Sequence, residues 1–215
     1  MKKLFYIFVG VLVVGVMGCG HWPWDRGEKE SENVLVNPGF DKSPWNSGWV
    51  IDTATSWERD SLSYTSADVS VNSDSGIFSP KCCCLRTYSL ANCTGDGIGR
   101  YAIAGANGMI SQMFDVVDGY KLKARVNFSY VFDSRAQSGC EIEVHTNGEW
   151  ISVWDKSDLD SLGKWVEILI ESESQIDGIR FCVYSSAYVS GVNIGCQSSY
   201  GSFRVDDIYV GKYEE

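Results

Sequence analysis

Apolar and polar residues alternate along much of the chain, and this alternation predicts β-strands. The clearest case is 121–132, KLKARVNFSYVF, where every second residue from Leu122 to Phe132 is apolar. A period of two places one face of a strand against a core and the other toward solvent. Similar patterns predict strands within 34–36, 49–51, 67–71, 82–88, 109–117, 141–146, 149–154, 164–171, 178–184 and 203–210.

These short strands are separated by Gly, Ser, Asn and Asp, and long amphipathic helices are hard to find. The chain has 22 glycines and four prolines among its 215 residues. We therefore expect an all-β fold, a β-sandwich jelly roll of about ten antiparallel strands in two sheets.

The stretch 141–154, EIEVHTNGEWISVW, predicts a hairpin whose turn is Asn147-Gly148. That dipeptide favours a two-residue type I′ turn, which fixes the register of the two strands. One face then carries core residues such as Val144 and Ile142. The other face is predicted to carry Glu141, Glu143, His145, Trp150 and Trp154. Indole rings beside carboxylates form the composition of a sugar-binding face; alternatively, the two tryptophans pack under a loop or under the second sheet.

The closing stretch FRVDDIYV (203–210) has adjacent carboxylates, Asp206 and Asp207, in the middle of a strand pattern. Asp is disfavoured in strands. The apolar residues change from odd to even positions between Val205 and Ile208. This slip predicts a bulge or a twist at the two aspartates.

The N-terminus predicts export. Two lysines precede an apolar run that is too short to span a bilayer, and the run ends at Gly18-Cys19. Residues 1–18 are predicted to be a signal peptide, and the sequence around Cys19 resembles the bacterial lipobox, in which the cysteine is acylated. Residues 19–33 then form the lipidated cysteine and a flexible tether, and 34–213 form one domain. We expect a lipid-anchored envelope protein at the outer membrane or cell surface; ordinary secretion is the alternative.

The charge of the chain is acidic. It has 18 Lys and Arg against 28 Asp and Glu, for a net charge of −10. Removal of Lys2 and Lys3 with the signal peptide leaves 16 − 28 = −12. This balance argues against nucleic acid and anionic lipid surfaces as partners.

Several stretches resemble carbohydrate-binding modules of the family 4/9/22 type, which are galactose-binding-like jelly rolls. They are NVLVNPGFD (33–41), SGWV (47–50), ISQMFDVVDGYKLKARVNFSY (110–130), GKWVEILIE (163–171) and FRVDDIYV. The resemblance implies core positions for Trp49 and Trp165. It also implies a structural calcium held by Asp41 and Asp206, with Asp207 as second choice. Asp41 stands where the family usually has Glu, one methylene longer.

No family motif transfers to the ligand-contacting aromatic residues. We nevertheless expect Tyr184 and Tyr188 to join the hairpin residues in contacting an oligosaccharide or polysaccharide.

Eight cysteines in an exported chain indicate an oxidising compartment. With Cys19 acylated and Cys83 as the buried odd thiol, six candidates for disulfides remain: Cys82, Cys84, Cys93, Cys140, Cys182 and Cys196. The favoured pair is Cys182 with Cys196. A zinc site is the competing interpretation, although regular Cys-x-x-Cys spacing is absent.

The sequence has no nucleophile elbow, zinc-protease motif or phosphate loop. Glu141 and Glu143 could serve as the acid and base of an inverting glycosidase, but we expect no enzyme. The predicted function is noncatalytic carbohydrate binding by a surface lipoprotein with a structural calcium. The alternative is a structural or interaction lipoprotein whose sandwich meets an envelope protein and no sugar.

Overall fold

The computed structural model describes residues 32–58, 64–72, 82–93, 101–132, 136–156, 163–190 and 195–213. Ser31–Glu215 forms a compact unit of its own. The predicted signal peptide, Cys19 and nearly all of the predicted tether lie outside the described residues, as does the side chain of Cys93. Within the described ranges, no helix has the length and apolar character needed to cross a bilayer.

Ten strands form two antiparallel sheets of five, as the sequence predicted. Sheet A has the order β1-β4-β9-β6-β7 and sheet B the order β2-β3-β10-β5-β8. The strands are β1 (Val50–Glu58), β2 (Tyr64–Asn72), β3 (Cys82–Cys93), β4 (Tyr101–Val117), β5 (Tyr120–Phe132), β6 (Ala136–Thr146), β7 (Glu149–Asp155), β8 (Trp165–Ser172), β9 (Ile176–Ser190) and β10 (Gly195–Lys212).

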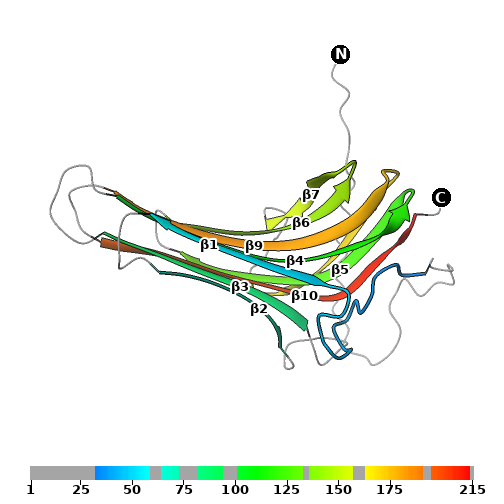
Figure 1. The fold of residues 1–215 in the computed structure, drawn as a ribbon, viewed down its shortest axis with the longest axis horizontal. Helices are drawn as coiled ribbons and strands as arrows, with labels where there is room; N and C mark the ends of the chain where they lie inside the picture. The colour runs from blue at the N-terminus through cyan, green and yellow to red at the C-terminus, as the bar shows by residue number, and fades with distance from the viewer. Residues whose placement is uncertain are drawn as a thin grey trace, which may run out of the picture. The chain divides into compact units, whose positions relative to one another are not determined.

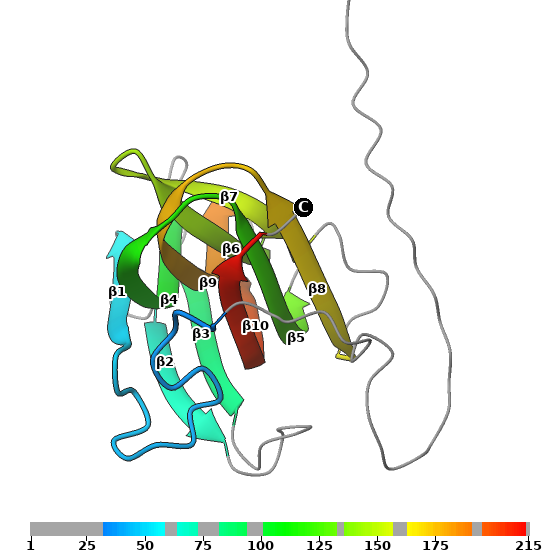
Figure 2. The same cartoon turned by 90° about the vertical axis from the view of Figure 1, so that its right-hand side faces the viewer.

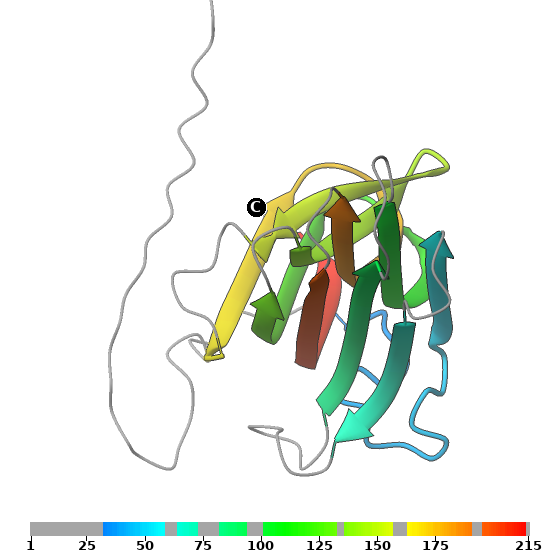
Figure 3. The same ribbon diagram turned by 90° about the vertical axis from the view of Figure 1, so that its left-hand side faces the viewer.

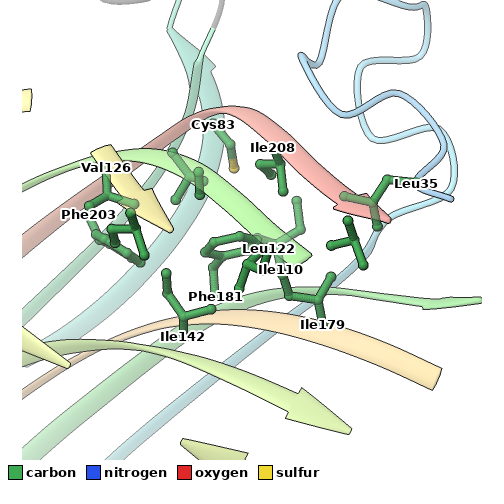
Figure 4. Close-up of a cluster of buried hydrophobic side chains, with 14 of the residues drawn as sticks. Leu35, Cys83, Ile110, Leu122, Val126, Ile142, Ile179, Phe181, Phe203 and Ile208 are labelled. Carbon is green, nitrogen blue, oxygen red and sulfur yellow. The ribbon is translucent and has the colours of Figure 1, made fainter. Parts of the chain in front are cut away.

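The two sheets lie face to face, as the end-on views in Figure 2 and Figure 3 show. Figure 1 shows β9 and β6 bent along their length, so that the outward face of sheet A is concave. The core fills the space between the sheets. Its largest fully buried side chains include Phe128, Phe181 and Phe203, and Figure 4 shows Phe181 and Phe203 in this cluster with Leu122 and Ile142.

Strand β5 illustrates how the sequence pattern produces this core. Leu122, Val126 and Phe128 are completely buried, whereas Lys121 and Lys123 are half-buried at alternate positions. The predicted core positions of Trp49 and Cys83 are confirmed, since both belong to the buried cluster. Trp165 differs from its prediction: it is half-buried and pairs with Asn127.

Asn127 alternates with core residues along β5, so Trp165 lies on the outward face of sheet B and not in the core. The neighbouring Val166 takes the inward position and packs against the core. A shift of one residue along a strand exchanges the two faces.

The β6–β7 hairpin has the predicted turn and most of the predicted register. Asn147 and Gly148 have φ values of 53° and 82°, as a type I′ turn requires. The pairs from Thr146 with Glu149 back to Glu143 with Ser152 are those predicted.

The register then shifts between Glu143 and Ile142, so that Ile142 pairs with Trp154 and not with Val153. This bulge turns Trp154 to the core side, where its ring stacks on Phe203 at 6.2 Å between centroids and 12° between planes. The prediction that Trp154 faces outward is therefore wrong. The reason is a one-residue bulge, which cannot be predicted from the sequence of the turn.

The predicted irregularity in β10 is confirmed. The register against β5 shifts between Asp206 and Tyr209, and Asp207 has a φ of 51°. The bulge allows both Val205 and Ile208 to be buried in the core.

The N-terminal segment runs along the end of β10. The Val34 amide donates to the Val210 carbonyl at 2.9 Å, and the Asn33 side chain bonds Ile208 O at 2.9 Å and Val210 N at 3.1 Å. No strand is assigned at 34–36, contrary to the prediction. Val36 instead exchanges hydrogen bonds with the side chain of Gln112, which ends any ladder along β10.

The favoured disulfide is not formed. Cys182 lies on β9 of sheet A, whereas Cys196 is the second residue of β10 in sheet B. Among the cysteines with described side chains, Cys82, Cys83, Cys84, Cys140, Cys182 and Cys196 are all free thiols. The two cysteines are close in sequence, on either side of a glycine-containing loop, but they lie in different sheets. A disulfide requires Cα atoms within about 7 Å of each other.

Candidate functional site

The concave outward face of sheet A gathers most of the residues predicted to contact a glycan. Strand pairing places Glu141, Glu143 and His145 of β6 on this face, next to Tyr184 and Trp150. These side chains alternate with buried residues such as Ile142 and Val144. Tyr188 lies on the same face, farther along β9, and is 42% exposed.

A hollow of about 270 Å³ lies on this face, over β1, β4 and β9. Its outward-facing lining residues are Ala54, Ser56, Gly105, Asn107, Tyr184 and Ser186. Most of these side chains are small, so they leave room above the sheet. The hollow thus combines one aromatic ring with hydroxyl and amide groups, as small-molecule sites commonly do.

The Tyr184 ring lies across the neighbouring strand β6 because its register partner there is a glycine. A Cβ added at Gly139 would lie 2.1 Å from Tyr184 Cζ and 2.2 Å from its hydroxyl oxygen. Only glycine leaves space for the ring in this position. The end of the ring that carries the hydroxyl group is therefore held over Gly139.

Trp150 faces outward as predicted, but its ring is covered. The Arg180 guanidinium lies over the indole at 4.4 Å from the ring centroid, and the His145 ring is 5.0 Å away. His145 in turn contacts Asp177 through Nδ1, at 2.5 Å from Oδ1. Trp150 is thus part of a packed group at one end of the face, and Tyr184 is the ring beside the hollow.

Glu143 is held by two donors. Arg180 Nε lies 2.5 Å from its Oε2, and the Cys182 thiol donates to the same oxygen at 3.1 Å. Burial alone would raise the pKa of Glu143, but these hydrogen bonds outweigh it and hold the pKa below its ordinary value. Glu143 is therefore a fixed, ionised group.

Glu141 behaves in the opposite way. Burial, followed by the charge of Glu143, raises the pKa of Glu141. Ligand atoms of Glu141, Glu143 and Cys182 lie within 4.8 Å of one another. This is shorter than the spacing of about 6.5–9.5 Å that separates the carboxyl groups of an inverting glycosidase.

The same three residues are a poor match for zinc. A zinc-binding cysteine must be a thiolate, but burial and the Glu143 carboxylate raise the pKa of the Cys182 thiol. Arg180 already supplies a positive charge to Glu143. Glu143 and Cys182 therefore already satisfy each other and Arg180 through hydrogen bonds, without a metal ion.

The proposed calcium ligands fit an ion poorly as they stand. Asp206 is completely buried in register with Arg125, and its Oδ1 accepts the Asp207 amide at 2.9 Å. Asp41 and Asp207 are exposed. Among the described residues, Asp41, Asp206 and Asp207 do not meet in one cluster of ligand atoms. Calcium stays a prediction from the sequence resemblance.

Sequence reasoning missed the β1–β4 side of the site. β4 begins at Tyr101 and β9 continues to Ser190, beyond the predicted strands, because YAIAGANG is too small and apolar on both faces to show clear alternation. Gly139 carried no sequence signal, since its role depends on its pairing with Tyr184.

No protein-family model matches the chain, and no curated protein is significantly similar to it in sequence. Among solved structures, the chain is similar to a carbohydrate-binding module of the β-sandwich superfamily, with 13% identity, a TM-score of 0.38, and coverage of 76% of this chain and 56% of that one.

Two further structures are similar at the same level. One comprises the CBM22-1–GH10 modules of Clostridium thermocellum xylanase 10B with xylohexaose, at 13% identity, TM-score 0.36 and coverage of 86% and 29%. The other is the enzymatically active domain of bacteriophage CBA120 tailspike protein 4. It has 9% identity and a TM-score of 0.37, with coverage of 83% of this chain and 21% of that one. The chain spans just over half of the module and less than a third of the other two. All three TM-scores are below 0.5.

Proposed function

We propose that the concave face of sheet A binds a glycan without cleaving it. The observation that carries this proposal is the Tyr184 ring lying over Gly139 beside the 270 Å³ hollow. A tyrosine held in this way stacks on the apolar face of a pyranose. Asn107 and Ser56 then offer an amide and a hydroxyl to the sugar's hydroxyl groups.

The hollow also suits a chain of several sugars. Tyr188 lies four residues beyond Tyr184 on the same face of β9. Its register partner on β4 is Ile103. Tyr188 is 42% exposed and Ile103 is 38% exposed. At about 3.3 Å per residue, the two tyrosines are roughly 13 Å apart along the strand. Tyr188 therefore provides a second apolar contact for an oligosaccharide that extends along β9.

Binding without cleavage is favoured by the state of the two glutamates. A hydrolytic acid and base must both reach the glycosidic bond. Glu143 is instead held by Arg180 and Cys182 at its Oε2, with a side chain that is only 12% exposed. Release of reducing ends from a polysaccharide incubated with the protein would contradict this part of the proposal.

The experiment is a glycan array followed by calorimetric titration of a bound glycan. We expect Tyr184→Ala to weaken binding at least about tenfold, because it removes the stacking ring. Tyr209→Ala is the matched control: Tyr209 is a half-buried tyrosine of sheet B, with Lys123 over its ring at 5.4 Å. An equal loss of glycan affinity in the two variants would contradict the placement of the sugar site at Tyr184. An empty array, together with specific recovery of an envelope protein, would favour the interaction lipoprotein.

We also propose that acylated Cys19 anchors the domain at the outer membrane or cell surface, where polysaccharide is accessible. This rests on the lipobox resemblance. Metabolic labelling with a fatty acid should modify the wild type and not Cys19→Ala. Secretion of the unlabelled wild type would contradict the anchor.

Calcium is a further proposal that rests on the sequence resemblance. If Asp41 and Asp206 move together around an ion, calcium should raise the melting temperature and EDTA should lower it, because a ligand that binds only the folded state stabilises it. The effect should vanish in Asp41→Asn. An unchanged melting temperature of the wild type with calcium and with EDTA would contradict the calcium proposal.

A further inference from the structure

Three carboxylates share one row across the concave face of sheet A. Asp52 pairs with Met109 of β4, Met109 with Cys182 of β9, Cys182 with Glu141 of β6, and Glu141 with Asp155 of β7. Residues that are directly opposite in an antiparallel sheet present their side chains to the same face. The row therefore places acidic side chains on three strands of the concave face.

This row borders the hollow. Asp52 precedes the lining residue Ala54 by two positions on β1, and Glu141 follows Gly139, under the Tyr184 ring, by two positions on β6. Two residues along a strand span about 7 Å, which is within reach of an extended sugar. Burial first, and then the charges of Glu141 and other neighbours including Asp155, raise the pKa of the Tyr184 hydroxyl.

The arginine on this face is already paired with a carboxylate. Among the outward positions that the structure describes on sheet A, Arg180 is the single Lys or Arg, and it pairs with Glu143 at 2.5 Å. Lys156, at the end of β7, is turned inward, where it contacts Ser138 O and lies over the Tyr130 ring. Across the described strands, the row therefore brings three carboxylates and no Lys or Arg to the edge of the hollow.

We propose that this acidic row makes the hollow select glycans by charge, and that its preferred ligand carries protonated amines, as a glycan of free amino sugars does. Glu141 and Asp155 are the specificity-determining residues. The inference rests on the proposed function, because it concerns the same hollow. A rim of carboxylates attracts an ammonium group, is indifferent to an acetamide and repels a uronate.

The test uses two oligosaccharides with one backbone, β-1,4-linked glucosamine and its fully N-acetylated form, with a galacturonate oligomer as the anionic reference. Binding is measured by calorimetry at mildly acidic pH and low salt on the wild type and on the double variant Glu141→Gln/Asp155→Asn. The control Asp68→Asn/Glu171→Gln removes the same charge from the outward face of sheet B, where Asp68 and Glu171 pair with Arg86 and Lys121.

We expect the glucosamine oligomer to bind the wild type and the control about tenfold more tightly than the N-acetylated one, and the galacturonate to bind most weakly. Added salt and the double variant should both reduce this preference. Equal binding of the two matched oligomers, or a preference that survives in the double variant, would overturn the inference. Binding of neither oligomer while neutral glycans bind would also overturn it and leave the proposed function standing. Failure of every glycan on the array to bind would overturn both.

Discussion

Tyr184 of β9 and Gly139 of β6 are register partners, and the tyrosine ring occupies the space above the glycine. The two residues lie 45 positions apart in the sequence. Their pairing holds the hydroxyl end of the tyrosine ring over β6, and the same residue lines the hollow. The proposed sugar site depends on this pair more than on either residue alone.

Gly139→Ala should therefore weaken glycan binding about tenfold or more without unfolding the domain. The new methyl group would lie 2.1 Å from Tyr184 Cζ, so the ring must swing away from its position. Calorimetry gives the affinity, and circular dichroism checks the fold.

Gly108→Ala is the control for this substitution. A Cβ at Gly108 would meet Val183 Cγ1 at 3.6 Å, which is an ordinary contact, so its glycan affinity should stay close to that of the wild type. Unchanged affinity in Gly139→Ala would show that the ring's position is irrelevant to binding.

Trp154→Ala should cost about 3–5 kcal/mol of the free energy of unfolding, because it removes a large ring that packs on Phe203. Trp150→Ala should cost about 1–2 kcal/mol, since that ring lies on the outward face and mainly loses its contact with Arg180. Urea denaturation measures both. The reverse order would mean that Trp154, and not Trp150, faces solvent.

The fold could be predicted further than the site. The strand pattern, the Asn147-Gly148 turn and the bulge at Asp206 all follow from local sequence, because alternation and positive φ are local properties. The orientation of Trp154 could not be predicted, since it is reversed by one bulge that has no signal in the local sequence. The Tyr184–Gly139 pair could not be predicted either, because register between distant strands is set by the whole sheet.

The described thiols should differ sharply in reactivity. Burial, together with neighbouring charges, raises the pKa of Cys82 to about 11, and burial also raises the pKa values of Cys83, Cys140 and Cys182. Thiolates are the reactive species. In the native protein, iodoacetamide should modify exposed Cys196 first, as mass spectrometry can show.

The buried thiols should react with iodoacetamide only after denaturation. The same measurement tests the disulfide hypothesis. A Cys182–Cys196 bond that resists alkylation in the denatured, unreduced protein would contradict the arrangement of the two sheets.

Glu143 should make stability depend on pH in the acidic range. Its pKa is lower in the folded chain than the ordinary 4.5, so the unfolded chain binds the proton first as the pH falls. Its contribution to stability is present above about pH 4.5 and is lost as the pH falls through the folded-state pKa. Glu143→Gln should cost about 1–3 kcal/mol at neutral pH and flatten the acidic slope.

Glu141→Gln is the counterpart, with the opposite sign. The folded pKa of Glu141 is raised, so its contribution is present at low pH and is lost as the pH rises through that pKa. The amide resembles the protonated carboxyl group, so this variant should be slightly more stable than the wild type near neutral pH. Urea denaturation across a pH series measures both variants. Parallel curves for Glu143→Gln and the wild type would contradict the Arg180–Glu143 pair.

The most direct test of the sugar site is an NMR titration of the isotope-labelled protein with a glycan identified on the array. We predict that the amide shifts concentrate at Gly105, Asn107, Tyr184 and Ser186, around the hollow on sheet A. Shifts concentrated on the outward face of sheet B, or around Trp150 with none at Tyr184, would contradict it.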